Sequence, residues 1–396
     1  MQRPEAGEPL LAIFWRFLRF GCLAWGGPVA QIAMIKRELV DEEGWIATGR
    51  FNRLLAIYQV LPGPEAHELC VHFGVMKGRR LGGLLAGLGF MLPGLLLILA
   101  LGWLYQRLDF QHPQVAAVFM GIQIGVIALI ARAVHRIADH ALTDRALWII
   151  AAASAGCTAL GVSFWVTLAA AGLVYAAVRA DRRLVASLVA VAAAMIAMMT
   201  GESALPITPD VQRGGPENAV SAVPLFLSGL KAGLLTFGGA YTAIPFVRDD
   251  AVGRGWVSEN QFLDSLALSG VIPAPLIIFA TFVGYIAGGL AGALAMTAGI
   301  FLPAFAFGLL FFDRLEAVID NERLHRFLEG VAAGVIGLIA VTAVQLGWSA
   351  SRSVPSLPWG AALFVASLAV LCLWRSKASV PALVLGSGLA GALVFR

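Results

Sequence analysis

Long apolar runs separated by short polar bridges follow one another along almost the whole chain. A helix needs about 20 apolar residues to cross the hydrocarbon core of a bilayer. The segments that fit this pattern, about thirteen of them, lie at residues 10–40, 47–77, 81–105, 113–133, 145–161, 162–179, 184–200, 223–251, 257–287, 289–312, 325–346, 357–374 and 379–395. The pattern therefore predicts an all-α integral membrane protein.

A polar stretch over residues 201–222 interrupts this series. It is rich in proline and glycine, and its acidic side chains outnumber its basic ones. Such a composition is typical of a linker. We therefore predict an N-terminal repeat over residues 1–200, an external linker over 201–222 and a C-terminal repeat over 223–396.

The composition excludes several classes of protein. Of the 396 residues, 59% are hydrophobic and 13% are charged, against about 25% charged residues in soluble domains. A soluble enzyme, a disordered chain and a secreted disulfide scaffold are excluded on these values. The four cysteines form no C-x-x-C pair, so we expect no metal site, and no cofactor motif is present.

The basic residues indicate how the chain is oriented in the bilayer. The formal net charge is +4, and the basic side chains gather in bridges such as 77–80, 132–145 and 179–183. In our count of segments these bridges all fall on one side, which is the cytoplasmic side because positive loops stay inside. We therefore expect a multi-pass protein of a bacterial inner membrane with a cytoplasmic N-terminus and a periplasmic C-terminus. Nucleic acid is not an expected partner, the lipid bilayer is, and a homodimer is compatible with the sequence.

The second half of the chain repeats the first. Trp25-Gly26-Gly27 matches Phe237-Gly238-Gly239, Gly44-Trp45 matches Gly255-Trp256, and Pro62-Gly63-Pro64 matches Pro273-Ala274-Pro275. Seven predicted segments precede the second copy, and an odd number turns that copy upside down in the membrane. The bridge Lys77–Arg80 becomes Ala287–Leu290 and loses every charge, as a loop moved to the outside does. Inverted repeats are typical of secondary transporters.

The first two segments of each copy are interrupted by helix-breaking residues. The breaks lie at Gly26-Gly27-Pro28, Pro62-Gly63-Pro64, Gly238-Gly239 and Pro273-Ala274-Pro275. Proline removes a backbone donor and restricts the residue before it, but it suits the first position of a new helix. Each break should therefore expose a helix N-terminus with free N–H groups inside the membrane, and four such termini together favour an anion.

Two cations are candidate ligands for that anion. Arg19 lies six residues before the first break, and Lys231 lies at the matching place in the second copy. A cation at membrane depth usually faces a partner or an aqueous path. Arg16 is closer to the helix start, from which its side chain can reach the membrane surface.

A titratable cluster follows the second break. Glu65, His67 and Glu68 are its members, and the second copy has Leu276, Ile278 and Phe279 in their places. Acidic and imidazole groups in a transporter core are typical of proton coupling. The alternative is that they only cap a helix start, where glutamate is favoured.

At these residues the chain resembles the chromate ion transporter family in its long, two-domain form. The resemblance covers nearly the whole length, with Phe17–Pro28, Gly44-Trp45 and Pro62–Glu65 as its most specific parts. It implies a bacterial inner-membrane protein that exports chromate, confers resistance to it, and is driven by the proton gradient or by exchange with another anion. Sulfate, a similar dianion, is the expected competitor. The second copy departs from the pattern because Pro-Ala-Pro lacks the acidic residue that follows the first copy's Pro-Gly-Pro.

The sequence predicts a secondary transporter, not an enzyme, that moves a tetrahedral oxyanion by alternating access. Arg19 and Lys231 would supply full charges, and the helix N-termini at the breaks would supply N–H donors. The residues assigned to the substrate site at the breaks are Gly26, Gly27, Pro28, Pro62, Pro64, Gly238, Gly239, Pro273 and Pro275. Two alternatives stay open. One is a membrane-embedded enzyme that acts on a lipid-linked phosphate, with Glu65, His67 and Glu68 as acid and base. The other is a channel for sulfate or another anion.

Overall fold

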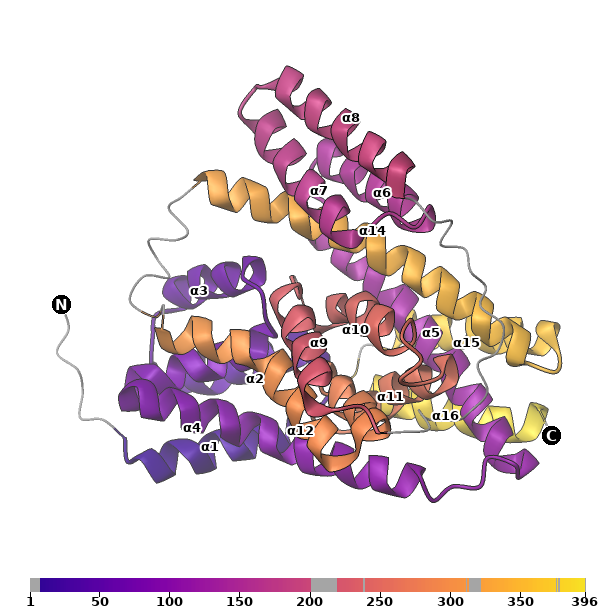
Figure 1. The fold of residues 1–396 in the computed structure, drawn as a ribbon. Coiled ribbons are helices and arrows are strands. Elements are labelled where there is room, and N and C mark those ends of the chain that lie inside the picture. Colours follow the sequence, from indigo (N-terminus) through magenta and orange to yellow (C-terminus); the bar gives the residue numbers. More distant parts are fainter. Residues whose placement is uncertain are drawn as a thin grey trace.

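The computed structural model of the chain is built from helices (Figure 1). It describes residues 8–200, 219–237, 239–310, 312, 322–374, 376 and 378–395, and every regular element within these ranges is helical. The prediction of an all-α protein is therefore confirmed. Most of the predicted linker lies outside the described residues.

The first half of the chain contains two short broken segments, two long helices and three shorter helices. In order, the elements are α1 (Leu10–Cys22), α2 (Gly27–Ile35), the π-helix η1 (Lys36–Glu42), α3 (Thr48–Val60), α4 (Glu65–Tyr105), α5 (Pro113–Ala141), α6 (Arg145–Ala159), α7 (Phe164–Arg179) and α8 (Arg183–Thr200).

The second half follows a similar order among its described residues, but two shorter helices instead of three follow its long helices. These are α9 (Ala222–Leu234), the 3-10 helix η2 (Ala240–Ala243), α10 (Ile244–Ala251), α11 (Glu259–Val271), the 3-10 helix η3 (Leu276–Ile278), α12 (Phe279–Leu310), α14 (Glu322–Ser353), α15 (Leu357–Leu373) and α16 (Ser379–Val394).

The interruptions predicted from glycine and proline are present in the backbone. α1 has 13 residues, which is a length of about 20 Å and too short to cross the bilayer core. It ends before Gly26, whose φ of 87° is left-handed, and Pro28 lies in the first turn of α2. Pro64 is the N-cap of α4, and Pro275 is the N-cap of η3. Gly238, another predicted break residue, lies outside the described residues, and its neighbour Gly239 also has a positive φ.

The two repeats share a sharp kink where the sequence separates two predicted segments, 47–77 from 81–105 in the first repeat and 257–287 from 289–312 in the second. In α4 the kink lies at Gly78 (φ −136°, ψ 21°) and Arg79 (φ 54°, ψ −156°). In α12 it lies at Gly288 (φ −142°, ψ 21°) and Gly289 (φ 62°, ψ −154°). At each kink the chain folds back on itself: Gly74 lies against Gly82 and Ala86, and the hydroxyl oxygens of Thr281 and Thr297 are 2.7 Å apart. In α4 a first segment of about 20 Å, beginning at the break, thus packs against a second segment that is long enough to span the membrane.

A long helix of each half packs against two shorter helices of the other half. α5 packs against α15 and α16, whereas α14 packs against α6 and α7. The contacts are made by small residues: Gly121 lies against Ser387 of α16, and Gly330 lies against Ala171 of α7. Small side chains let membrane helices approach closely. The halves are therefore interlocked, and Figure 1 shows α14 running alongside α6 and α7.

The equivalent helices α4 and α12 pack against each other in opposite directions. Gly83 lies against Leu309, Gly87 against Phe305, and Gly102 against Tyr285. The partner number falls as the number in α4 rises, so the two helices are antiparallel. A twofold axis that superimposes one of two antiparallel helices on the other is perpendicular to both helices.

Four helices in the described part of the chain are long and apolar enough to cross a membrane. They are α4, α5, the stretch Leu276–Leu310 that contains η3 and α12, and α14. Six shorter apolar helices accompany them. The structure thus supports a multi-pass membrane protein, and the number of thirteen membrane segments stays a prediction.

Candidate functional site at the helix breaks

Two hydrogen-bonded contacts, called ties below, connect the breaks of one repeat to the breaks of the other. The backbone N–H of Gly63, in the second break, donates a hydrogen bond of 2.9 Å to the carbonyl oxygen of Thr236, which follows α9. The side-chain amide of Gln31, in α2, donates to the carbonyl oxygens of Ala24 (2.9 Å) and Ala274 (3.0 Å). Each tie thus joins the first break of one repeat to the second break of the other, and the predicted break residues meet where the two repeats contact each other.

Gln31 is a site residue that the sequence reasoning missed. Its side chain is buried, and both of its amide contacts are to carbonyls at breaks. Its amide oxygen is buried without a hydrogen-bond partner among the described residues. A lone amide in the apolar run after Gly26 was the available signal, because a buried polar group needs partners that irregular backbone can supply.

Glu68 lies directly against the second break. It is in the first turn of α4 together with Glu65, and both side chains are buried. A methyl group at position 63 would lie 2.6 Å from Glu68 Oε1. Both carboxylate oxygens of Glu68 lack a hydrogen-bond partner in the part of the chain that the structure describes. A carboxylate buried without a donor is costly unless it takes up a proton or a partner, so Glu68 is suited to bind and release a proton.

The His67 side chain packs against aromatic side chains of α12. Its ring is fully buried and lies 5.0 Å from the ring of Phe301 and 4.7 Å from that of Phe305, both on α12. It therefore lies in the contact between α4 and α12. The sequence grouped His67 with Glu65 and Glu68, and the structure separates it from them by placing it among aromatic rings.

His72 continues the row of titratable side chains along α4. It lies four residues after Glu68, and its Nδ1 is 2.9 Å from the hydroxyl of Tyr58 on α3. On its other side its ring centroid lies 4.5 Å from that of Phe312. The row thus leads from the break toward the kink of α4.

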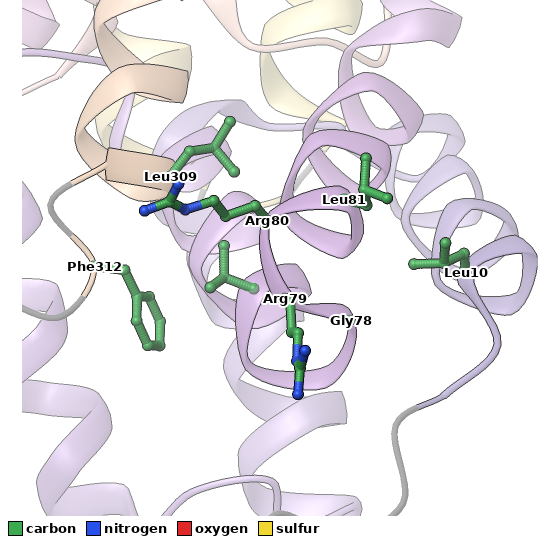
Figure 2. A pocket seen from close by; sticks show the side chains of 8 residues that line it. Leu10, Gly78, Arg79, Arg80, Leu81, Leu309 and Phe312 are labelled. Atoms are coloured by element: carbon green, nitrogen blue, oxygen red, sulfur yellow. The ribbon is translucent and has the colours of Figure 1, made fainter.

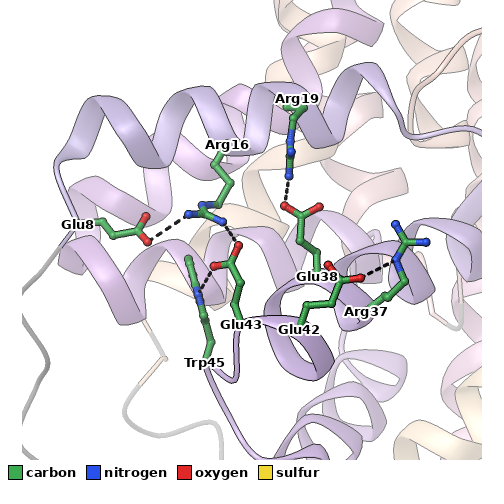
Figure 3. A network of polar contacts seen from close by, with 8 residues as sticks. All are labelled: Glu8, Arg16, Arg19, Arg37, Glu38, Glu42, Glu43 and Trp45. Atoms are coloured by element: carbon green, nitrogen blue, oxygen red, sulfur yellow. Dashed lines mark hydrogen bonds and ion pairs between the residues drawn. The ribbon is translucent and has the colours of Figure 1, made fainter.

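Arg19 is engaged by a carboxylate of its own repeat. It lies in the last turn of α1 and forms an ion pair with Glu38 of η1 (Figure 3). Arg16, one turn earlier, forms ion pairs with Glu8 and Glu43. These contacts hold η1 against α1, so Arg19 has a structural partner in this conformation.

Lys231 repeats this arrangement in the second half. It lies in the last turn of α9, 2.7 Å from Asp250 and 3.5 Å from Asp249. Asp249 is the residue that matches Glu38 in the repeat. The lysine is also 5.0 Å from the ring centroid of Phe164. A substrate anion would have to compete with these carboxylates for either cation.

The second half contains a buried acidic site that the sequence analysis did not single out. Asp264 of α11 is 2% exposed and accepts hydrogen bonds from Tyr105 (2.6 Å) and Gln123 (2.8 Å). An aspartate inside the apolar segment 257–287 was the signal, because an ionisable residue at membrane depth marks a functional or paired position. Unlike Glu68, Asp264 has its donors in place.

The profile of a family described as "Chromate transporter" matches the chain twice, over residues 11–177 and 223–392. This chain belongs to the chromate transporter family. Members of the chromate transporter family are transport proteins rather than enzymes, so the alternative of a lipid-phosphate enzyme has no support. The two profile matches agree with the repeat found in the sequence.

Relatives in the chromate transporter family cover most of the chain. A protein named "Chromate transport protein" from Pseudomonas aeruginosa is 60% identical over 97% of this chain and 92% of its own length. A second protein of that name, from Cupriavidus metallidurans, is 31% identical over 86% of this chain and 83% of its own. An "Uncharacterized transporter YwrA" from Bacillus subtilis matches 30% of this chain at 29% identity and covers 67% of its own length. No solved structure matches the chain significantly.

Proposed function

We propose that this protein is a secondary transporter that exports chromate across the bacterial inner membrane by alternating access. Family membership and the 60% identity to a chromate transport protein support the substrate. Export gives resistance to chromate, and the proton gradient or exchange with another anion would drive it. Sulfate, which has the same shape and charge, is the expected competitor.

The single observation that carries this proposal is the set of four helix breaks tied across the repeats. Irregular backbone is tolerated at membrane depth only where protein buries it or where it lines a cavity. The ties from Gly63 to Thr236 and from Gln31 to Ala274 join both repeats at one place. If the repeats rock against each other, these ties are the contacts that change first. The substrate then meets the N-termini of α2, α4, η2 and η3, whose N–H groups favour an anion.

The antiparallel packing of α4 and α12 supports an inverted repeat. Both helices have the length and apolar character of membrane spans, so the axis that exchanges them lies in the plane of the membrane. This agrees with the odd number of segments before the second copy and with the loss of charge between Lys77–Arg80 and Ala287–Leu290. We therefore retain the division into repeats 1–200 and 223–396, with a cytoplasmic N-terminus and a periplasmic C-terminus.

In this mechanism Arg19 and Lys231 exchange their carboxylate partners for the substrate anion. Arg19 leaves Glu38, and Lys231 leaves Asp249 and Asp250, when the anion is bound. Glu68 and Glu65, next to the second break, carry the proton in exchange. His67 lies among phenylalanine rings at the contact between α4 and α12, where a change in its charge would alter how these two helices pack.

Chromate flux into inverted membrane vesicles tests the proposal. We expect saturable uptake that increases when a pH gradient is imposed and that sulfate inhibits competitively. Uptake that does not saturate and does not respond to the gradient would indicate an anion channel instead.

A further inference from the structure

The first broken segment of the first repeat folds back on itself. Arg16 of α1 forms ion pairs with Glu43, which follows η1, and with Glu8, which precedes α1 (Figure 3). Arg19, one turn further along α1, pairs with Glu38 within η1. The partner number after the break thus falls as the number in α1 rises, so the two arms are antiparallel. Both ends of the segment lie together, and the break forms the turn at the other end.

The second broken segment has the same shape. Trp45, which precedes α3, has its ring centroid 6.0 Å from that of Phe73 and 5.0 Å from the Lys77 ammonium, both before the kink of α4. Closer to the break, the hydroxyl of Tyr58 lies 2.9 Å from Nδ1 of His72. α3 and the first part of α4 are therefore antiparallel arms, and the second break is the turn between them.

The second part of α4, after the kink, shows how deep these turns lie. Its apolar run is bounded by Arg80 and Arg107 and is about 40 Å long. α1 runs beside it in the same direction, since Leu10 lies against the kink (Figure 2) and Gly21 lies against Pro93. Pro93 is 13 residues after Arg80 and 14 before Arg107. α1 therefore ends half-way along a helix that is long enough to span the membrane.

All four breaks reach this middle level. Gly94 lies against Ala274 in the second break of the second repeat, and Gln31 joins Ala274 to the first break of the first repeat. The first part of α4 runs back along the second part from the kink, so its start at the second break lies at this level too. That break reaches the first break of the second repeat through the hydrogen bond from Gly63 to Thr236.

The second repeat builds two such segments on α12. Gly233, near the end of α9, lies against Ile300, near the middle of the apolar run 289–312. Lys231 of α9 pairs with Asp249 of α10, beyond the break, so these arms also lie side by side, and α12 folds back at its kink as α4 does. Because α4 and α12 are antiparallel, the broken segments of the second repeat start from the opposite end of the molecule.

We propose that the four broken segments are re-entrant hairpins, which enter the membrane and return to the face from which they came. Residues 10–42 and 48–77 enter from one face, and residues 222–251 and 259–287 enter from the other. Four of the thirteen predicted segments then do not cross the bilayer. Two of these four precede the second copy, so an odd number of crossings still inverts that copy and leaves the two termini on opposite faces.

The tips of the hairpins, which are the four breaks, form a gate. Each tie joins a tip from one face to a tip from the other, Gly63 to Thr236 and Gln31 to Ala274. A path that enters along the hairpins of either face therefore ends at these contacts, and the tips must separate before an anion can pass. The gate rests on the proposed function, whereas the hairpin shape does not.

Thiol labelling of the loops between the hairpins distinguishes hairpins from spanning segments. Ala47 lies between the hairpins of the first repeat and Arg254 between those of the second, and both are exposed. Single cysteines are placed at these positions in the full chain, with Cys22, Cys157 and Cys372 replaced by serine, and an impermeant thiol reagent is applied outside intact cells. We expect Arg254→Cys to be labelled and Ala47→Cys to be protected.

Arg80→Cys and Leu290→Cys are the matched references, because one broken segment separates each of them from one tested position. A hairpin places Ala47 on the same face as Arg80, and Arg254 on the same face as Leu290, whichever face is cytoplasmic. Spanning segments place the two members of each pair on opposite faces. That second pattern would overturn the proposal, even if chromate flux is normal.

A disulfide between two tips tests the gate. Ala24 and Ala274 accept hydrogen bonds from the same Gln31 amide, so their backbones lie close together. We expect oxidation of the double variant Ala24→Cys/Ala274→Cys in inverted vesicles to lower chromate flux about tenfold or more, because a lid that cannot open blocks the transport cycle. A reductant should restore the flux, and either single variant should keep its flux under the same oxidation. Full flux in the cross-linked protein would overturn the gate.

The rate of cross-linking is a second measurement, and it does not require flux. Because a bound anion holds the tips apart, we expect saturating chromate to slow formation of the disulfide severalfold in the same double variant. A rate that chromate leaves unchanged would contradict the gate. Wild-type vesicles that take up no chromate, in a protein whose Ala47 shares the face of Arg80, would contradict the proposed function and leave the hairpins in place.

Discussion

Comparison of the two repeats distinguishes backbone features that both share from functional side chains that only one of them has. Both repeats place a cation in the last turn of their first helix and pair it with an acidic side chain beyond the first break, as Arg19 does with Glu38 and Lys231 with Asp249. Both kink their fourth helical stretch with nearly the same dihedral angles. Each also contributes one break to each of the two hydrogen-bonded ties at the centre.

The same comparison shows where the repeats differ. After its second break the first repeat has Glu65, His67 and Glu68, whereas the second has only apolar side chains there. At the kink the first repeat has Arg79 and the second has Gly289. The second repeat instead buries Asp264, with both carboxylate oxygens hydrogen-bonded. In the proposed mechanism, the similar backbones of the repeats would allow inward-facing and outward-facing conformations, and the titratable groups of the first repeat would couple the cycle to protons.

The topology of the repeats is the first relation to test, because its outcome is all or none. Arg80 and Leu290 lie at equivalent positions and are both exposed, whereas Ala287 is 2% exposed and unsuitable for labelling. We expect an impermeant thiol reagent outside the cell to label Leu290→Cys and not Arg80→Cys, in a background without Cys22 and Cys372. Equal labelling of the two positions would contradict the inverted repeat.

Gly63, which lies close to the Glu68 carboxylate at the second break, should be the position of the first repeat that is most sensitive to substitution. Gly63→Ala adds a methyl group against the Glu68 carboxylate, at a φ of 148° that alanine rarely adopts. We expect transport to be lost and the protein to be destabilised by about 1–3 kcal/mol, measured by chromate flux and thermal unfolding. Gly49→Ala, in α3 with open space around it, is the matched control and should gain about 0.5–1 kcal/mol of helix stability. Normal flux in Gly63→Ala would remove this break from the pathway.

The two cation–carboxylate pairs should differ in strength. The side chains of Lys231 and Asp250 are 16% and 4% exposed, against 56% and 17% for Arg19 and Glu38. Double-mutant cycles with glutamine and asparagine should give a coupling of about 0.2–1 kcal/mol for the exposed pair and a larger one for the buried pair.

Measurements of transport distinguish two roles of Arg19, which are binding of the substrate and pairing with Glu38. If Arg19 binds the substrate, Arg19→Gln lowers chromate flux more strongly than Glu38→Gln at equal protein abundance. Equal losses in the two variants would mean that the arginine acts only by holding η1 in place.

The smallest expected effect concerns the two kinds of buried carboxylate. Glu65→Gln should keep the fold, because an amide has the same shape, but flatten the dependence of chromate flux on an imposed pH gradient. Asp264→Asn should keep that dependence and lower the melting temperature, because Tyr105 and Gln123 already satisfy the carboxylate. The measurement is flux over a series of pH gradients. An unchanged slope in Glu65→Gln would make Glu65 a helix cap and leave Glu68 as the residue to test.

The sequence by itself determined the helical membrane class, the repeat and most of the break positions. These follow from local chemistry: apolar runs need a bilayer, Pro62-Gly63-Pro64 cannot continue a helix, and Gly26-Gly27-Pro28 strongly disfavours one. The pairing of matched residues over a nearly constant offset required no structure either.

Only the tertiary structure decided which of these residues meet. Gln31 reaches Ala274 and Gly63 reaches Thr236 across more than a hundred residues of chain, and no local pattern records such contacts. Adjacency in the chain grouped His67 with Glu65 and Glu68, but the packing of α12 places the rings of Phe301 and Phe305 against the His67 ring. Arg19 and Lys231 appeared from the sequence as free charges, yet each meets a carboxylate from the helix after the break. A side chain's neighbours depend on how helices fold back on one another, and that depends on the packing of the whole chain.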